Sequence, residues 1–298
     1  MKIAVTGAMG FIGHELVDKL LFDGHEVIAV DFCRGLMNTY MAAKYPIMTE
    51  LFRVLPRCSV IEPWEFLENF DKINADVVVH AGAVVDTRDN GTEELFDKNL
   101  KYVEMLTDAC DDLGVYLVFI SSAAIYGNEG FPNNPYGFTK ALGEKIVRKN
   151  ATGTVSLRLF NVFGRYEHHK GEMASLLWRL NSSLRSGKEF NLHSLDAERD
   201  FVPSSSVVLS IVKVIENFDD GRHHVFDVGT GKATSIERLQ KMMKDVNPEC
   251  DAGLLKYGEV PEIFIGKYQM YTCAGKHDAE NIGGIITTEE GIGRLYGR

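Results

Sequence analysis

The sequence has few cysteines, and none of them is arranged to bind a metal or to form a redox pair. The five cysteines are scattered along the chain without a CxxC pair or a Cys/His metal spacing. An odd number of dispersed cysteines is typical of reduced thiols and argues against a disulfide scaffold. We therefore expect free thiols, no metal, and a cytoplasmic location.

Positive charge is also scarce. The chain has 32 Lys and Arg against 42 Asp and Glu, which gives a net charge of −10 and a pI of about 5.4. This balance excludes a generic binder of nucleic acid or of anionic membranes. An anionic ligand would have to be held by a few placed basic residues and by helix N-termini.

Long hydrophobic runs are missing as well. The longest, such as VYLVFI, are far too short to cross a bilayer. The chain begins with the strand-like segment KIAV, so we expect no signal peptide. With 298 residues, 45% of them hydrophobic, the sequence is typical of a soluble globular protein without a membrane partner.

Short apolar runs rich in β-branched residues alternate with amphipathic helical segments through the first half of the chain. The expected strands are 3–6, 27–31, 76–82, 115–122 and 154–161, and helices are expected between them, including one over 93–113 and one after Pro135. Strands that are apolar throughout indicate a parallel sheet covered on both faces. We predict an α/β fold of the Rossmann type, a doubly wound parallel sheet, with a smaller C-terminal α/β lobe.

A glycine-rich turn lies between the first expected strand and the first helix. Gly7, Gly10 and Gly13 permit a tight turn and close approach of the backbone to a pyrophosphate. Asp31 ends the second strand and would accept a hydrogen bond from a ribose hydroxyl, which favours NAD. Arg34 could instead bind a 2′-phosphate, which favours NADP. The turn predicts a dinucleotide site and leaves NAD or NADP open.

This site suggests how the chain is divided. We expect an NAD(P)-binding domain over residues 1–165, rejoined by about 200–230, and a lobe over 166–298 that mainly binds substrate. From about residue 166 the pattern of strands and helices becomes less regular.

A serine, a tyrosine and a lysine form a candidate catalytic set. Ser122 ends a strand, and Tyr136 and Lys140 lie four residues apart at the start of a helix, so they share one face. We expect the Lys140 ammonium to lower the pKa of Tyr136 toward neutrality and make it a general base. Ser122 would orient a substrate oxygen.

The motifs TGAMGFIG, VVVHAGA, DKNLKYVEML, SSAAIYG and the tyrosine-lysine pair resemble those of the extended short-chain dehydrogenases/reductases that act on nucleotide sugars. The resemblance implies a tightly bound nicotinamide cofactor that is kept while a substrate hydroxyl is oxidised and the ketone is reduced again. The cofactor-binding residues that it implies are Gly7, Gly10, Phe11, Ile12, Gly13, Asp31, Phe32, Arg34, Ala81, Gly82, Ala83, Asn99, Lys140 and Val162.

The residues after Ser122 narrow the reaction. Dehydratases of this group resemble one another in having Asp-Glu at that place, where an acid protonates the leaving hydroxyl. This chain has Ala123 and Ala124, and alanine cannot supply a proton. We therefore expect an epimerase.

The segment FNVFGRYEHHKGEMAS closely resembles a motif of the ADP-glycero-manno-heptose 6-epimerases, and IGKYQMYT resembles a second motif of that family. The resemblance implies that Lys170 is a second acid/base, opposite Tyr136. A ketone that can present either face needs a proton donor on each side. We expect burial beside Arg165 or Arg179 to lower the pKa of Lys170. His168 and His169 lack a carboxylate cluster at ligand spacing, so we expect no metal there.

The match is imperfect at two positions. Glu172 stands where the family has serine, and Arg179 stands where it has histidine, so the charge around the sugar is altered. The implied substrate-binding residues are Ser122, Asn161, Glu172, Arg179, Arg199 and Tyr268. The expected substrate is a sugar attached to a nucleoside diphosphate, and the family resemblance implies a homo-oligomer.

Two alternatives stay open. A 4-epimerase acting on a UDP- or GDP-sugar would need only Tyr136 and a ketone that rotates in its pocket. A non-catalytic dinucleotide-binding protein would keep the fold without turnover, although the presence of Ser122, Tyr136 and Lys140 argues against it.

Overall fold

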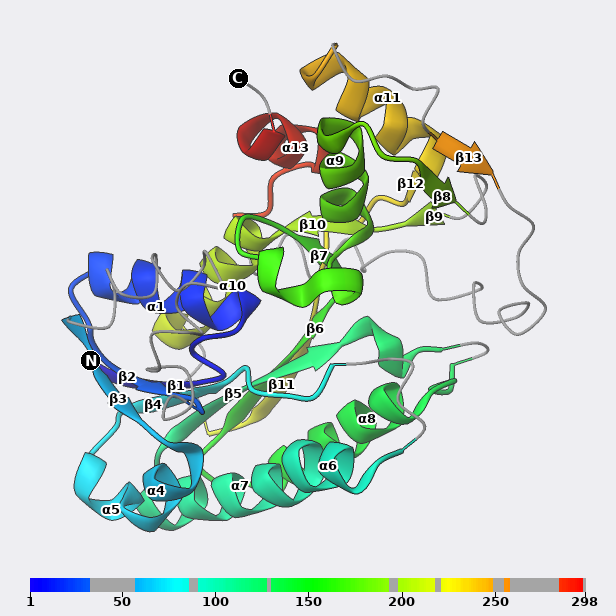
Figure 1. Ribbon diagram of the computed structural model, residues 1–298. Coiled ribbons are helices and arrows are strands. Elements are labelled where there is room, and N and C mark those ends of the chain that lie inside the picture. The colour runs from blue at the N-terminus through cyan, green and yellow to red at the C-terminus, as the bar shows by residue number, and fades with distance from the viewer. Residues whose placement is uncertain are drawn as a thin grey trace.

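The computed structural model describes residues 1–32, 57–85, 91–127, 130–192, 198–217, 221–248, 255–257 and 284–296. Seven parallel strands form the main sheet in the order β11-β6-β5-β4-β1-β2-β3 (Figure 1). Their bounds are β1 (Lys2–Thr6), β2 (Glu26–Val30), β3 (Ser59–Ile61), β4 (Val77–His80), β5 (Tyr116–Ser122), β6 (Thr154–Leu159) and β11 (His223–Val228). The predicted doubly wound sheet is confirmed.

Helices cover both faces of this sheet (Figure 1). On one face lie α1 (Phe11–Phe22) and α10 (Ser204–Asn217), and on the other lie α4 (Pro63–Glu68), α5 (Phe70–Ile73), α7 (Tyr102–Leu113) and α8 (Pro135–Val147). Each face has its own apolar core. Because both faces are buried, β1, β4 and β5 are almost entirely apolar, as a covered parallel sheet requires.

The start of α8 is fixed by its first residues. Asn134 accepts a hydrogen bond from the Gly137 amide at 2.8 Å and caps the helix, and Pro135 occupies its first position. Proline is favoured there because the first amide has no partner inside the helix. Tyr136 and Lys140 are thereby placed on the first turns of α8, beside the end of β5.

The helix expected over 93–113 is interrupted. It consists of α6 (Glu93–Phe96), the π-helical segment η2 (Asp97–Lys101) and α7. Single π turns are often found at functional sites. In this one, the Asn99 side chain points to the backbone of Val84, donating to its carbonyl at 2.9 Å and accepting from its amide at 2.8 Å.

A smaller group of elements packs beyond the carboxyl edge of the sheet. Its members are β7 (Asn161–Phe163), η4 (His168–Met173), α9 (Leu176–Ser186), β8 (Phe190–Leu192), β9 (Glu198–Arg199), β10 (Phe201–Pro203), β12 (Thr234–Ser235), α11 (Ile236–Val246), β13 (Leu255–Tyr257) and α13 (Thr288–Tyr296). A separate apolar core joins β7, β8, β10, α9, α11 and α13. The proposed division at about residue 165 stays a prediction. None of the helices in the described part of the chain is long and apolar enough to cross a membrane.

A buried ion pair connects α8 to the neighbouring strand β6. Arg158 donates through Nε and Nη2 to the two carboxylate oxygens of Glu144, at 2.9 and 2.8 Å. Ser121 donates to the same carboxylate at 2.6 Å, and Arg158 also donates to the Tyr126 hydroxyl at 2.8 Å. The pair is bidentate and nearly enclosed, so the loss of one partner would leave a buried charge.

Replacing Arg158 with methionine should therefore lower the free energy of unfolding by about 3 kcal/mol, because the buried Glu144 carboxylate would lose both hydrogen bonds from Arg158 and keep the one from Ser121. Urea denaturation of the two proteins measures the difference. Arg294→Met is the matched control, since its pair with Glu290 is exposed and worth at most about 1 kcal/mol. Equal losses in the two variants would contradict the argument.

His80 ends β4 inside the core. Its ring stacks between Tyr102 and Phe119, with both centroid distances 5.8 Å, and Nδ1 shares a 2.7 Å hydrogen bond with the Thr6 hydroxyl. Burial, with a smaller contribution from Lys140, lowers the pKa of His80 to about 3. The folded state thus keeps His80 neutral where the unfolded chain binds a proton.

Because the unfolded histidine has a pKa near 6.5, the stability from His80 is present above that value and is lost as the pH falls toward 3. Between pH 7 and pH 5 the wild-type protein should lose about 2 kcal/mol more stability than His80→Gln. Urea titrations of both proteins at the two pH values give this difference. Parallel pH profiles would show that His80 becomes protonated in the fold.

Candidate active site

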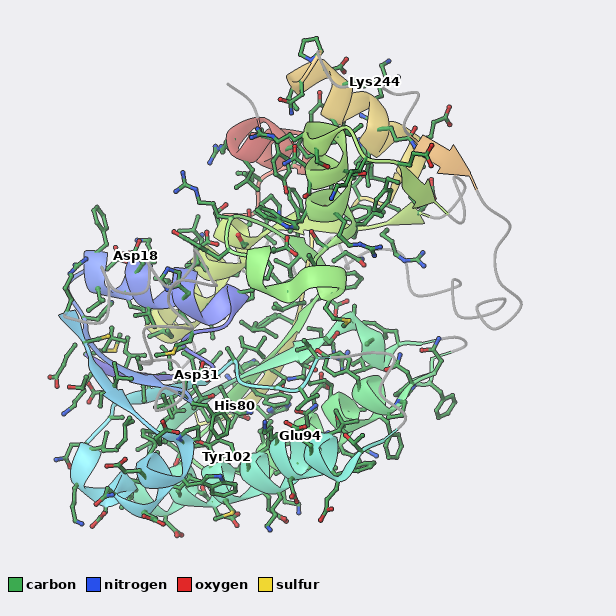
Figure 2. The ribbon with its side chains drawn as sticks, viewed as in Figure 1. Asp18, Asp31, His80, Glu94, Tyr102 and Lys244 are labelled. Atoms are coloured by element: carbon green, nitrogen blue, oxygen red, sulfur yellow. The ribbon has the colours of Figure 1, made fainter. Side chains whose placement is uncertain are left out.

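A cavity of about 1080 Å³ lies at the carboxyl ends of β1, β2, β4 and β5. This is where parallel α/β sheets place their ligands, and the volume suits a large ligand. Figure 2 places Asp31 and His80 in the middle of the molecule, between α1 and the helices of the other face, with Glu94 on α6 below them. Of the residues predicted for the site, the cavity is lined by Gly7, Gly10, Phe11, Ile12, Gly13, Asp31, Phe32, Ala81, Gly82, Ala83, Ser122, Tyr136, Lys140, Val162 and Lys170.

The glycine-rich turn leaves no room for side chains. A Cβ on Gly13 would lie 2.0 Å from the Gly7 carbonyl oxygen, so only glycine permits this contact. No side chain caps the N-terminus of α1, and its first turn has no acidic residue. The helix therefore presents its N-terminal amides and positive potential at the cavity, as a pyrophosphate requires. These residues fit a dinucleotide.

Asp31 faces the cavity and also supports the glycine-rich turn. Its Oδ2 accepts from the Met9 amide and its Oδ1 from the Phe32 amide, both at 2.8 Å. Burial raises the pKa of Asp31, and these hydrogen bonds oppose the increase. Each carboxylate oxygen keeps a lone pair for a ligand hydroxyl. Arg34, the competing candidate, lies outside the described residues.

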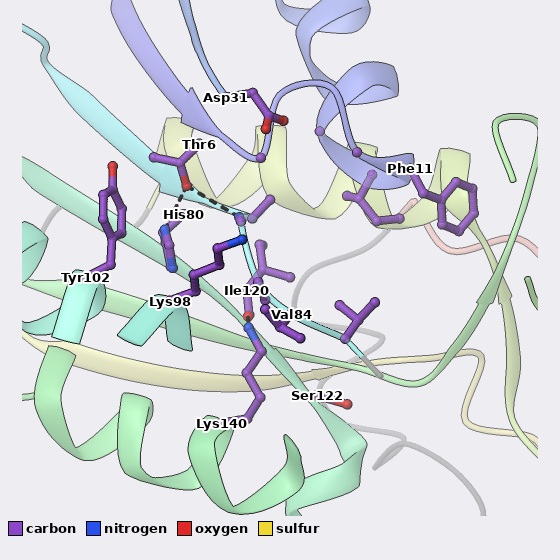
Figure 3. A pocket seen from close by; sticks show the side chains of 18 of the residues that line it. Thr6, Phe11, Asp31, His80, Val84, Lys98, Tyr102, Ile120, Ser122 and Lys140 are labelled. Carbon is purple, nitrogen blue, oxygen red and sulfur yellow. Dashed lines mark hydrogen bonds between the residues drawn. The ribbon is translucent and has the colours of Figure 1, made fainter. Parts of the chain in front are cut away.

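Hydrogen bonds to neighbouring side chains fix the loop after β4. The Thr6 hydroxyl lies between His80 and the Gly82 amide, which donates to it at 3.4 Å (Figure 3). Asn99, predicted to touch the cofactor, does not line the cavity but supports this loop through its two bonds to Val84. Its amide also donates to Thr139 of α8 at 3.1 Å.

Ser122, Tyr136 and Lys140 come together as predicted, but their electrostatics differ from the expectation. Burial raises the pKa of Tyr136 to about 12, and a hydrogen bond with Ser122 only partly opposes this. The Lys140 ammonium lies 6.0 Å from the Tyr136 ring centroid and donates to the Ile120 carbonyl at 2.7 Å (Figure 3). The expectation that Lys140 lowers the tyrosine pKa is wrong, because desolvation dominates and the ammonium is directed to the strand.

Lys140 itself is almost completely buried. Burial lowers its pKa to about 8, and the Glu144 carboxylate one helical turn away opposes this. Its Nζ also lies 4.9 Å from the Phe119 ring centroid. Lys140 is therefore a fixed, partly desolvated cation at the base of the cavity.

Lys170 lines the same cavity as Tyr136. Its Nζ lies 4.9 Å from the Phe11 ring centroid and 4.0 Å from Glu167 Oε2. The pKa of Lys170 is lowered, as predicted. The cause is burial alone, with Glu167 opposing it; Arg165 and Arg179 make no resolved contribution.

Three of the predicted substrate-binding residues, Asn161, Arg179 and Arg199, do not line this cavity. Asn161 donates to the Asp200 carbonyl at 3.2 Å, the Arg179 guanidinium lies 5.3 Å from the Phe190 ring centroid, and Arg199 donates to the Glu198 carbonyl at 2.7 Å. Tyr268 and the side chain of Glu172 lie outside the described part of the chain.

Several lining residues were not predicted. The cavity is also lined by Pro63, Trp64, Glu93, Glu94, Asp97, Lys98, Phe160 and Met173. Pro63, Trp64, Glu93 and Glu94 lie outside the quoted motifs. The other four lie within motifs but were not singled out, and only tertiary packing shows which side chains reach the cavity. Lys98 lies 4.8 Å from the Phe32 ring centroid and pairs with Glu94 at 2.6 Å. Among the described residues, no group of three or more His, Cys, Asp or Glu could hold a metal ion.

Comparison with known proteins identifies solved structures with this fold. MoeE5 in complex with UDP-glucuronic acid and NAD is 25% identical, with 99% of this chain and 98% of that chain covered and a TM-score of 0.77. The UDP-glucose 4-epimerase of Thermotoga maritima with UDP-glucose is 23% identical, covering 98% and 96%, with a TM-score of 0.79. The ADP-L-glycero-D-manno-heptose-6-epimerase of Helicobacter pylori is 22% identical, covering 97% and 93%, also with a TM-score of 0.79. At these lower identities the two epimerases show a shared fold.

The family model for the NAD dependent epimerase/dehydratase family matches residues 3–229, which include the glycine-rich turn, Ser122, Tyr136, Lys140 and Lys170. The protein therefore belongs to the NAD dependent epimerase/dehydratase family.

Proposed function

We propose that the protein is a nucleotide-sugar epimerase similar to the ADP-glycero-manno-heptose 6-epimerases. The observation that carries this proposal is that Tyr136 and Lys170, two candidate acid/base groups, line one cavity together with the glycine-rich turn. The HKGEMAS segment around Lys170, which resembles that family, supports the choice of sugar.

The proposed cofactor is NAD or NADP, kept in the site through the reaction. The glycine-rich turn and the N-terminus of α1 would hold its pyrophosphate, and Asp31 would accept from a ribose hydroxyl. When bound, the nicotinamide would supply reversible hydride transfer with the sugar carbon. Lys140, fixed at the base of the cavity, supplies a positive charge near this region.

Burial shifts the two candidate acid/base groups in opposite directions. It raises the pKa of Tyr136 to about 12 and lowers that of Lys170. When the environments of two titratable groups shift their pKa values in opposite directions, one group is suited to act as the acid and the other as the base. We assign Tyr136 as the proton donor and Lys170 as the acceptor in this direction of the reaction.

One proton is accepted and one is donated in the proposed reaction. Lys170 takes the hydroxyl proton as the substrate alcohol is oxidised to a ketone. The carbonyl group then rotates, so that its opposite face is presented to the cofactor site. Tyr136 gives its proton to the ketone oxygen as the alcohol forms again with inverted configuration. Ser122, bonded to Tyr136, can orient that oxygen. Proton exchange with water restores both groups.

A second candidate is a 4-epimerase acting on a UDP- or GDP-sugar. MoeE5, 25% identical over almost the whole chain, has been solved with UDP-glucuronic acid and with UDP-glucose. This similarity favours a UDP-sugar substrate. In such an enzyme the ketone rotates within the cavity and Tyr136 serves both faces, so Lys170 would be dispensable. For either enzyme, we propose a cytoplasmic homo-oligomer.

Incubation with ADP-D-glycero-D-manno-heptose in deuterated water tests the leading proposal. We expect conversion to the L-glycero epimer with no deuterium at carbon, because the hydrogen removed at C6 returns without mixing with solvent. Proton NMR of the sugar measures both conversion and labelling. Deuterium at carbon would contradict internal return. No conversion of this sugar or of UDP- and GDP-sugars by the cofactor-loaded protein would favour a non-catalytic protein.

Two substitutions distinguish the two epimerases. Tyr136→Phe should reduce kcat by about 10²–10⁴-fold in either, because a proton donor is lost. Lys170→Met keeps the apolar part of the side chain and removes the amino group. It should cause a loss of similar size only in the 6-epimerase, because only there does Lys170 act as an acid/base. The initial rate of epimerisation is the measurement. Full activity in Lys170→Met with a Tyr136→Phe defect would favour the 4-epimerase.

A further inference from the structure

Glu167 is a fully buried carboxylate beside the proposed base. Its Oε1 accepts from the Gly164 amide at 3.0 Å and from the Ser175 hydroxyl at 2.7 Å. Its Oε2 accepts from the Ser175 amide and lies 4.0 Å from Lys170 Nζ. One carboxylate therefore contacts both the N-terminus of α9 and the ammonium that lines the cavity.

The surroundings of this carboxylate favour a role beyond helix capping. Ser175 alone caps α9, because its hydroxyl accepts from the Trp178 amide at 3.2 Å. A fully buried carboxylate is costly, and a neutral acceptor such as glutamine could receive a hydrogen bond from Ser175. Capping of α9 therefore does not require the negative charge of Glu167. The cation beside that charge is the Lys170 ammonium, 4.0 Å away.

Few other charges act on this pair. Phe11 of α1 faces Lys170 with an uncharged ring, at 4.9 Å from Nζ. Tyr296 of α13 is buried near Glu167, and its pKa is raised by burial and by that carboxylate, so it stays neutral. Across the cavity, Tyr136 is also neutral below its pKa of about 12. Among the described residues, Glu167 is the charged group with a resolved effect on Lys170.

We propose that Glu167 is a positioning residue for Lys170: its carboxylate holds the ammonium against Phe11 at the cavity wall and sets how readily it releases a proton. The proposal rests on the proposed function, in which Lys170 is the base. In this arrangement Glu167 has two roles. It fixes the direction of the lysine side chain, and it stabilises the ammonium that forms when Lys170 accepts the substrate proton.

Loss of the charge has a predictable direction. Burial lowers the pKa of Lys170 and Glu167 raises it, so removing the Glu167 charge must lower the pKa further. A carboxylate within about 4–6 Å typically shifts a partner's pKa by about 1–3 units. In Glu167→Gln, Lys170 should therefore titrate at least about one pH unit lower than in the wild-type protein.

The test is competitive acylation of the full-length protein with trace acetic anhydride over a pH series, read by mass spectrometry. Lys170 is the only lysine between Arg165 and Arg179, so the tryptic peptide 166–179 reports it alone. Ser175→Ala is the matched control, because it removes a contact of Glu167 and the cap of α9 but leaves the charge. It should leave the titration midpoint of Lys170 in place.

The outcomes separate this inference from the proposed function. A lower midpoint in Glu167→Gln but not in Ser175→Ala supports the role of Glu167; an unchanged midpoint, or equal shifts in both variants, overturns it. Glu167→Asp moves the carboxylate away from Lys170 and should lower the titration midpoint by a smaller amount. This variant replaces Glu167→Gln in the test if Glu167→Gln does not fold. Activity in Lys170→Met instead tests the proposed function and does not alter the titration result.

Discussion

The parallel register of the central sheet is the constraint on which the site depends. All seven strands run in one direction, so the loops after β1, β2, β4 and β5 meet at one edge. Helices on both faces leave this edge as the place where backbone amides and polar side chains can meet a ligand. The glycine-rich turn, Asp31, His80 and Ser122 converge there from segments far apart in the sequence.

Burial then gives the converging groups their chemical character. Desolvation raises the pKa of Tyr136 and lowers the pKa values of Lys140 and Lys170, because removal from water disfavours the charged form of each group. Carboxylates moderate two of these shifts, with Glu144 acting on Lys140 and Glu167 on Lys170. A buried acid next to each lysine keeps an enclosed cation from becoming costly.

Part of this site could be predicted and part could not. Gly7, Gly10, Gly13, Asp31, Ser122, Tyr136 and Lys140 belong to motifs whose spacing follows the strands and helices, and all line the cavity. Arg179 and Arg199 were implied by the family resemblance, yet they contact Phe190 and Glu198 and do not line the cavity. Trp64 belongs to no motif, and Lys98 was not singled out within DKNLKYVEML, because packing and not local pattern brings their side chains to the cavity.

The sequence by itself determined the alternation of strands and helices, the doubly wound sheet and the order of the motifs along it. These features depend on local periodicity, glycine positions and caps, which neighbouring residues specify. Only the tertiary structure decided that Lys140 bonds to the Ile120 carbonyl, that Asn99 supports the Val84 loop, and that Glu167 lies beneath Lys170. Those contacts and the direction of each pKa shift depend on burial, which is a property of the packed chain and not of any segment.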